Sequence, residues 1–127
     1  MILVDSCVWI DFLRGRAGFE GLSGCISAGE VLAHPWVVGE IALGFSPGQW
    51  TSIAGLFADL ARADLLGNDE LVDFIQRRGL FGIGIGWVDA HLIGSALLGH
   101  ASLWTTDRHL AAAAARCGVP LYPRANA

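Results

Sequence analysis

The sequence predicts an α/β fold in which a mostly parallel sheet is flanked by helices. The chain opens with an apolar run, Met1 to Val4. A short run of this kind is typical of a strand buried on both faces of a parallel sheet. Further short apolar segments then alternate with longer helix-like segments, as in repeated β–α units. A length of 127 residues suits one domain, so we expect a single domain over residues 1–127.

Cap and turn residues set the expected elements in the first half of the chain. Ser6 follows the first strand and suits a helix cap, and Gly15 suits the end of that helix. Pro35 suits the first turn of a helix, and Pro47 ends that helix and begins the next. The expected elements are helices over 6–13, 19–26, 35–45 and 47–62, and a strand over 30–33.

The second half continues the alternation. Asn68 or Asp69 suits the cap of one helix, and Thr106 or Asp107 suits the cap of the last, whose alanine-rich centre favours helix. Alternate glycines over 81–86 predict a loop without the context of a nucleotide-binding motif. The expected elements are strands over 65–66, 102–105 and 119–122, and helices over 70–78, 87–98 and from 106 or 107 to 116.

The net charge of the chain bears on whether it binds nucleic acid. The net charge is −4, whereas nucleic-acid binders usually carry a basic stripe. Four of the twelve acidic residues occupy special positions, and without them the remaining eight acids balance the eight basic residues, all Arg. A divalent metal held by those four acids would cancel the negative field where a phosphate docks.

The cysteines and the chain start point to a cytoplasmic protein. The three cysteines are odd in number and widely spaced, form no zinc pattern, and are expected as reduced core residues. The start has no secretory signal pattern, and the longest charge-free stretch near the middle is too short to span a bilayer, so we expect no membrane association.

The four special acids are Asp5, Glu40, Asp89 and Asp107. Asp5 and Asp107 each lie where an expected strand passes into a helix, a position that also suits a plain helix cap. Glu40 and Asp89 have apolar neighbours at helical spacing, where an unpaired carboxylate is costly to bury. Glu40 could also pair with a buried Arg, and Asp89 could cap the helix after the glycine-rich loop.

Together the four acids predict a metal site. Ligands bind outside the carboxyl ends of parallel strands, where strand-end acids converge. Carboxylate oxygens suit Mg²⁺ or Mn²⁺, which commonly assist hydrolysis of phosphodiesters.

Four segments carry a family resemblance: ILVDSCVWIDFLRG, VVGEIALG, GIGWVDAHLIGSAL and LWTTDRHL. In their order and spacing the chain resembles PIN-domain ribonucleases, and within them the VapC-type toxins of bacterial toxin–antitoxin pairs. The resemblance implies a three-layer α/β/α sandwich with a mostly parallel central sheet, and Mg²⁺- or Mn²⁺-dependent cleavage of RNA. It also implies a cognate antitoxin that covers the active site.

The family's acidic quartet maps onto the same four acids as catalytic and metal-binding residues. The conserved hydroxyl of the last motif matches Thr105, with Thr106 and Ser6 as further supporting residues. Arg14, Arg16 and Arg108 lie near site acids in sequence and are candidate RNA-phosphate contacts or solvated surface charges. Because the chain is rich in apolar residues and tryptophan, we also expect a homodimer or a larger toxin–antitoxin assembly.

Two other functions compete with this interpretation. One is a non-catalytic PIN-like binding or assembly module, in which the acids serve as caps and buried pairs. The other is a phosphatase or receiver domain, which also gathers acids around Mg²⁺ but usually needs a Lys for the phosphoryl group. The absence of lysine disfavours this second rival.

Overall fold

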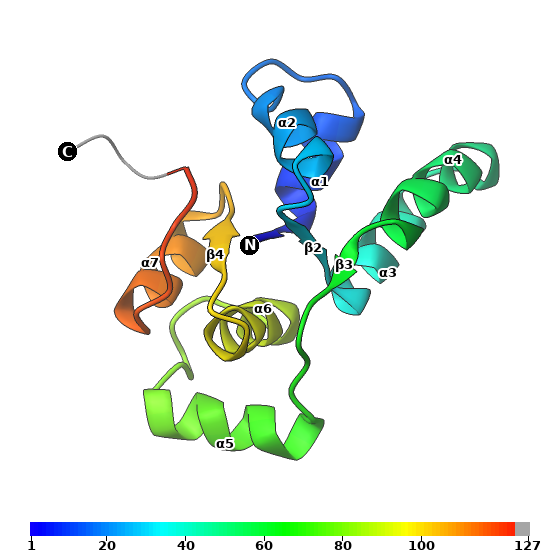
Figure 1. Ribbon diagram of the computed structural model, residues 1–127. Helices are drawn as coiled ribbons and strands as arrows, with labels where there is room; N and C mark the ends of the chain where they lie inside the picture. Colours follow the sequence, from blue (N-terminus) through cyan, green and yellow to red (C-terminus); the bar gives the residue numbers. More distant parts are fainter. Residues whose placement is uncertain (124–127) are drawn as a thin grey trace.

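The structure is a computed structural model, and it describes residues 1–123. These residues form four short strands and seven helices (Figure 1). The strands are β1 (Ile2–Val4), β2 (Val31–Ala33), β3 (Ala61–Arg62) and β4 (Ser102–Trp104). The helices are α1 (Ser6–Leu13), α2 (Gly21–Ser27), α3 (Pro35–Gly44), α4 (Pro47–Ala58), α5 (Asn68–Arg78), α6 (Trp87–Leu98) and α7 (Arg108–Arg116). The single domain expected over 1–127 stays a prediction, since residues 124–127 lie outside the described part.

The sheet is parallel throughout, which confirms the expected fold class. Its strands lie in the order β3-β2-β1-β4. β1 is central, and its Leu3 lies opposite Leu32 of β2 and Leu103 of β4. Because all strands run the same way, their carboxyl ends meet at one edge of the sheet.

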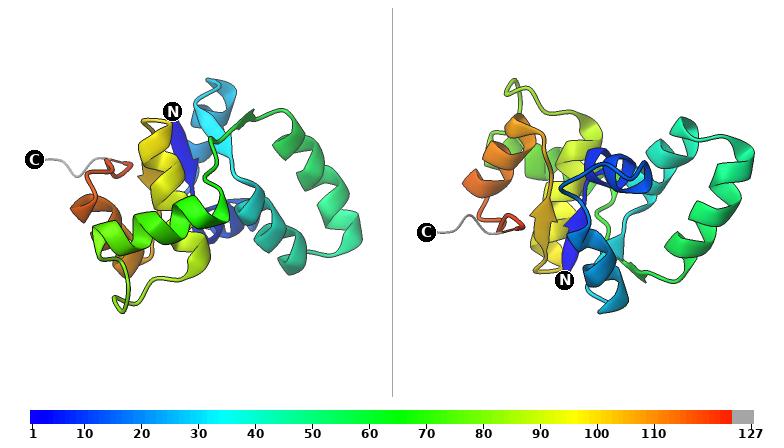
Figure 2. Two further views of the ribbon diagram at one scale, coloured as in Figure 1. Left: turned by 90° about the horizontal axis from the view of Figure 1, so that it is seen from below. Right: turned by 90° about the horizontal axis from the view of Figure 1, so that it is seen from above.

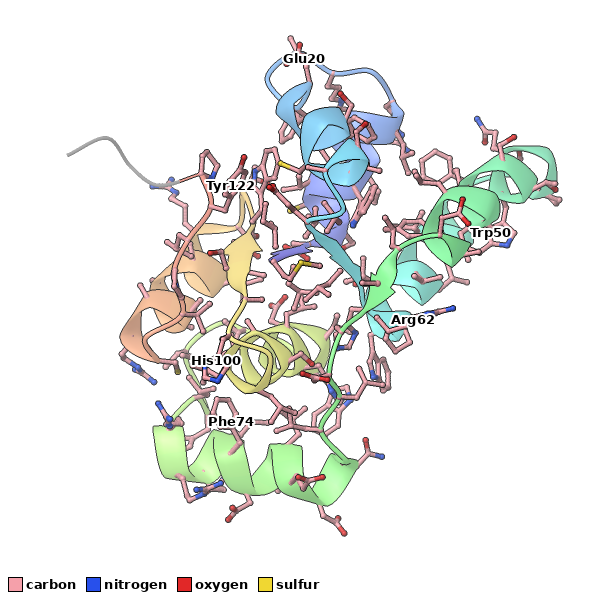
Figure 3. All side chains as sticks on the ribbon, viewed as in Figure 1. Glu20, Trp50, Arg62, Phe74, His100 and Tyr122 are labelled. Atoms are coloured by element: carbon pink, nitrogen blue, oxygen red, sulfur yellow. The ribbon has the colours of Figure 1, made fainter. Side chains whose placement is uncertain are left out.

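Helices cover both faces of this sheet, as the predicted three-layer arrangement requires. In Figure 1, α1 and α2 lie on one side of the strands, and α6 with α5 behind it lies on the other. The helix α4 projects away from the rest of the molecule (Figure 2), whereas α3 also packs against α1. Phe74 reaches from α5 toward α6 and is buried there (Figure 3).

The core lies between these layers and fixes the sheet. Leu3 and Leu103 from the strands, Trp9 from α1 and Ile93 from α6 are all essentially inaccessible to solvent. Each such side chain contributes roughly 1.5–3 kcal/mol by leaving water. The central strands are therefore a rigid platform for the loops at their carboxyl ends.

The expected helix of residues 47–62 is too long. Residues 47–58 are helical, and the chain then turns so that Ala61 and Arg62 pair with β2. The predicted strand at Leu65 and Leu66 is wrong, because the edge strand lies four residues earlier. Both β3 residues are exposed, so hydrophobicity gave no signal for this strand.

Two predicted caps also differ. Asp5 rather than Ser6 caps α1, because its side chain accepts a hydrogen bond from the Ser6 N–H. α5 begins at Asn68, with Gly67 as the cap residue, and the Glu70 side chain accepts from the Gly67 N–H. For residues 119–122, the strand expected there is reduced to one parallel bridge between Leu103 and Leu121.

Within residues 1–123, no helix combines the length and the apolar character needed to cross a membrane.

Candidate active site

The strand-end acids lie at the carboxyl edge of the sheet, as expected. Asp5 directly follows β1, and its N–H donates to the carbonyl of Trp104 at the end of β4 (2.9 Å). Asp107 lies three residues beyond β4 and caps α7. Since β1 and β4 pair directly, the two acids are neighbours at one edge.

Asp5 is the most enclosed of the four acids, with only 6% of its surface exposed. Its Oδ1 accepts from the Ser6 N–H (2.8 Å), and its Oδ2 accepts from the Thr105 hydroxyl (2.7 Å) and the Cys7 thiol (3.2 Å). These donors are uncharged, so they orient the carboxylate without neutralising it.

Glu40 and Asp89 lie on α3 and α6, near enough to the strand-end acids for those charges to help raise the pKa of both side chains. Burial raises the pKa of Glu40, a hydrogen bond from Ser6 opposes this, and the charges of Asp5 and Asp89 raise it further. Burial also raises the pKa of Asp89, a backbone hydrogen bond opposes it, and the charges of Asp5 and Asp107 add to the rise. The charge of Asp5 thus acts on both Glu40 and Asp89, and the charge of Asp107 acts on Asp89.

The surroundings of Glu40 differ from the expectation. Its side chain lies on the solvent-facing side of α3, beside the exposed Trp36 and Leu43, while Val37 and Ile41 form the buried face. The cost of burying a carboxylate among apolar residues therefore does not apply in full. Glu40 is unusual because the side chains beside it, Trp36 and Leu43, are apolar and also exposed.

Helix capping accounts for part of the role of three acids. Asp5 caps α1, Asp107 Oδ1 accepts from the N–H groups of His109 (2.8 Å) and Leu110 (3.1 Å), and Asp89 Oδ2 accepts from the Gly86 N–H (3.1 Å). In Asp89 and Asp107, one oxygen is held by the backbone and the other has no hydrogen bond within residues 1–123. Capping thus fixes their orientation and leaves an oxygen for a ligand.

No permanent cation pairs with these acids within residues 1–123. The ion pairs there join Arg16 to Asp11, Arg77 to Asp73, and His109 to Asp107, the last at 3.9 Å. Glu40 itself is exposed and forms no ion pair with an arginine of the described part. In their present rotamers, no three acid, histidine or cysteine side chains of the described part form a ready-made metal cluster.

Of the three predicted supporting residues, Thr105 and Ser6 contact site acids and Thr106 does not. Thr105 donates to Asp5, and its Oγ1 also accepts from the Asp107 N–H (3.0 Å), so one side chain joins two acids. Ser6 reaches Asp5 through its backbone and Glu40 through its side chain. Thr106 donates to the Cys7 thiol (3.2 Å) rather than to an acid.

Cys7 is the site residue that the sequence expectation missed. It was expected in the core, yet it is only half-buried and contacts Asp5 directly. Burial is the main cause that raises the pKa of its thiol. Its place in the first turn of α1, two residues after Asp5, is the signal that could have identified it.

The three arginines are spread around the site. Arg14 ends α1, roughly 13 Å from Asp5 along the helix, with its guanidinium over the Phe45 ring. Arg16 pairs with Asp11 at the same end. Arg108 directly follows Asp107 and is exposed. Their contact with RNA stays a prediction.

Two exposed tryptophans and two buried histidines join the helices that carry Glu40 and Asp89. The ring of His91 on α6 stacks on Trp36 of α3 (4.9 Å) and meets Trp87 edge-on (4.8 Å). Behind it, His34 accepts from the Trp36 N–H and contacts Ser95 (3.1 Å). Burial lowers the pKa of both histidines, to about 4 for His34. Neutral imidazoles thus pack α3 against α6.

A pocket of about 350 Å³ opens between these helices beside Glu40. Its lining is apolar apart from that carboxylate: Pro35, Trp36, Gly39, Glu40, Leu43 and Val88.

No family model matches the chain. In contrast, 122 of its residues are 44% identical to Ribonuclease VapC32 of Mycobacterium tuberculosis, in each of two strains. The alignment covers 95% of this chain and 96% of the relative. The chain belongs to the VapC ribonuclease family. The resemblance predicted from four short segments is thereby confirmed over nearly the whole length, and the parallel sheet with helices on both faces agrees with the PIN-like fold expected for a VapC ribonuclease.

Proposed function

We propose that this VapC-family chain is the toxin of a toxin–antitoxin pair and a Mg²⁺- or Mn²⁺-dependent endoribonuclease of the cytoplasm. The observation that carries the proposal is that Asp5 and Asp107 are neighbours at the carboxyl edge of a parallel sheet, near Glu40 and Asp89, whose pKa values the neighbouring acid charges help to raise. No arginine among residues 1–123 forms an ion pair with any of the four. Such an arrangement stores repulsion that a divalent cation relieves.

The donor set fits a hard divalent cation. Asp5, Glu40, Asp89 and Asp107 offer only carboxylate oxygens, the ligand type that Mg²⁺ and Mn²⁺ prefer. Asp5 is held by three hydrogen bonds, whereas Glu40 is exposed and has room to change rotamer. No ready-made cluster exists in the described residues, so the proposal requires side-chain movement toward the ion.

The surroundings of the four acids give them different roles at the proposed metal site. The chemistry that a bound divalent ion supplies is activation of a water and stabilisation of the leaving oxygen of the phosphodiester. Asp5 and Asp107 are anchored by Thr105 and by α7 and keep their orientation. Glu40 and Asp89, which project from α3 and α6, would complete the set of carboxylate ligands.

The partner proposal rests on exposed apolar surface. Leu43 is 90% exposed and Trp36 is 42% exposed, both on α3 and both at the pocket beside Glu40. Trp50 is only partly buried on the projecting α4 (Figure 3). Patches of this kind mark protein interfaces. We assign this surface to a homodimer and the neighbouring acids to a cognate antitoxin that covers the active site, with a basic side chain against the carboxylates.

Cleavage of RNA by the purified, antitoxin-free chain tests the function. With Mg²⁺ or Mn²⁺, wild-type protein should release discrete fragments from a total RNA pool, and excess EDTA should abolish them. Asp5→Asn should fold normally and cleave nothing, because the neutral amide is a much weaker metal ligand. Equal cleavage by wild type and Asp5→Asn would refute the assignment.

A non-catalytic PIN-like module is the alternative, and helix capping by three of the acids favours it. Caps explain their positions without any ligand. They do not explain why Glu40, which caps no helix, lies within electrostatic reach of Asp5 and Asp89. A module of this kind would bind RNA or protein without metal-dependent cleavage.

A further inference from the structure

Cys7 lies in contact with the acid at the centre of the site. Its Sγ is 3.2 Å from Asp5 Oδ2, 3.2 Å from Thr106 Oγ1 and 3.8 Å from Thr105 Oγ1. The other two cysteines differ. Cys25 contacts the Tyr122 hydroxyl, and Cys117 is buried at the opposite end of α7 from Asp107.

The hydrogen bonds around the thiol have a defined direction. The Thr106 hydroxyl donates to sulfur, and the thiol donates its own hydrogen to Asp5 Oδ2. Thr105 donates to the same oxygen. Both threonines of the segment after β4 thus act on Asp5, one directly and one through Cys7.

We infer that Cys7 is a positioning residue for Asp5, and that its thiol holds the carboxylate in the orientation needed to bind the divalent metal. This inference rests on the proposed function. Asp5 forms no ion pair with a cationic side chain within residues 1–123, so its orientation depends on uncharged hydrogen-bond donors. With Thr105 alone, Oδ2 would keep one side-chain donor, and the link from Thr106 to the acid would be lost.

Outer-shell donors of this type have a measurable effect on metal sites. Loss of such a partner typically weakens metal affinity or activity about 10–100-fold. A thiol is a weak donor, so we expect the low end, about tenfold, for removal of the Cys7 hydrogen bond. The effect should fall on metal affinity and kcat, while the KM for RNA stays unchanged, since Cys7 does not touch substrate.

Four variants test this. Cys7→Ala removes the donor, Cys7→Val removes it while filling the space, and Cys7→Ser keeps a donor at the same position. Cys117→Ala is the matched control, a buried cysteine away from the acids. Mn²⁺ affinity by calorimetric titration, kcat and KM on a defined RNA, and thermal unfolding should be measured for each.

The expected result is about tenfold weaker Mn²⁺ binding and lower kcat in Cys7→Ala and Cys7→Val, with most of the loss restored in Cys7→Ser and none in Cys117→Ala. Wild-type Mn²⁺ affinity in a folded Cys7→Val would overturn the inference, as would an equal loss in Cys7→Ser. If wild type itself bound no Mn²⁺, both the proposed function and the role of Cys7 would be refuted. If wild type bound Mn²⁺ and Cys7→Val did too, only the role of Cys7 would fall.

Discussion

Asp107 serves two purposes that a single substitution can separate. Its Oδ1 accepts two N–H groups at the start of α7, and its negative charge belongs to the coupled group of acids. Asparagine caps helices about as well as aspartate but lacks the charge.

We therefore expect Asp107→Asn to keep the stability of the fold and lose RNA cleavage. Asp107→Ala should lose cleavage and also about 1 kcal/mol of stability, because the cap is gone. Urea unfolding beside a cleavage assay measures both. Equal stability of the two variants would show that the cap contributes nothing, and full cleavage by Asp107→Asn would remove this acid from the site.

His34 makes stability depend on pH. Burial, with a smaller effect of His91, lowers its pKa from 6.5 to about 4. Between these values the unfolded state binds a proton that the folded state does not. Stability should therefore fall as the pH drops from about 6.5 to about 4, by up to about 3 kcal/mol from this residue, with no further contribution below.

His34→Asn tests this, since asparagine keeps a capping oxygen at the start of α3 and does not titrate. Urea unfolding at pH 7 and pH 4.5 should show a smaller loss of stability in this variant than in wild type. His100→Asn, at an exposed position with a positive φ that asparagine tolerates, is the control. The same loss of stability in both variants would contradict the role of His34.

At the scale of elements, sequence patterns predicted most of the fold because buried faces dominate it. Residues 87–98 and the strand before Asp5 were predicted closely, since unbroken apolar residues and glycines mark their limits. The strand Ala61–Arg62 was not predictable, because it consists of two exposed residues paired through backbone alone. The position of a short edge strand depends on its neighbour, which no local pattern encodes.

In the candidate site too, some residues were predictable from local sequence patterns and others were not. The four acids were found because a carboxylate at a strand end or among apolar residues is conspicuous in sequence. Cys7 was missed because a cysteine is usually a small core residue. One of its contacts, Asp5, is two residues away, but the other, Thr106, is 99 positions away in the chain. The exposed position of Glu40 was missed because α3 carries apolar residues on both its faces.

The loop of residues 81–86 is held against α7, and one glycine makes this possible. Gly84 has φ +85°, and a Cβ there would lie 3.0 Å from His109 Cδ2. Gly82 has a similar φ of +70° but open space around it. The two positions share backbone strain and differ only in the contact.

Gly84→Ala should therefore move the exposed His109 ring or the loop, and a shift of the loop would disturb Asp89, which the loop leads into. We expect a larger fall in kcat than for Gly82→Ala, while each variant loses about 1 kcal/mol of stability through the positive φ. Kinetics and thermal unfolding of both variants decide this. Equal kcat values would show that the loop does not position Asp89.

In the whole molecule, the apolar side chains Trp36 and Leu43 on α3 stay exposed to solvent when the chain is a monomer. Leu43→Asp places a charge at its most exposed apolar position and should convert a homodimer to a monomer without loss of thermal stability. Leu98→Asp, at the exposed far end of α6, should leave the dimer intact. Light scattering after size-exclusion chromatography gives the masses. A wild-type chain that is a stable, monodisperse monomer would remove the dimer from this account.

The central claim is that four acids act as one divalent metal site: one directly after β1, one on α3, one on α6 and one in the segment after β4. Calorimetric titration of Mn²⁺ into wild type, Asp5→Asn, Glu40→Gln, Asp89→Asn and Asp107→Asn tests it most directly. The account predicts that wild type binds Mn²⁺ and that all four folded variants bind it at least about tenfold more weakly. No binding by wild type, or unchanged affinity in all four variants, would contradict a shared metal site and leave the acids as helix caps and surface charges.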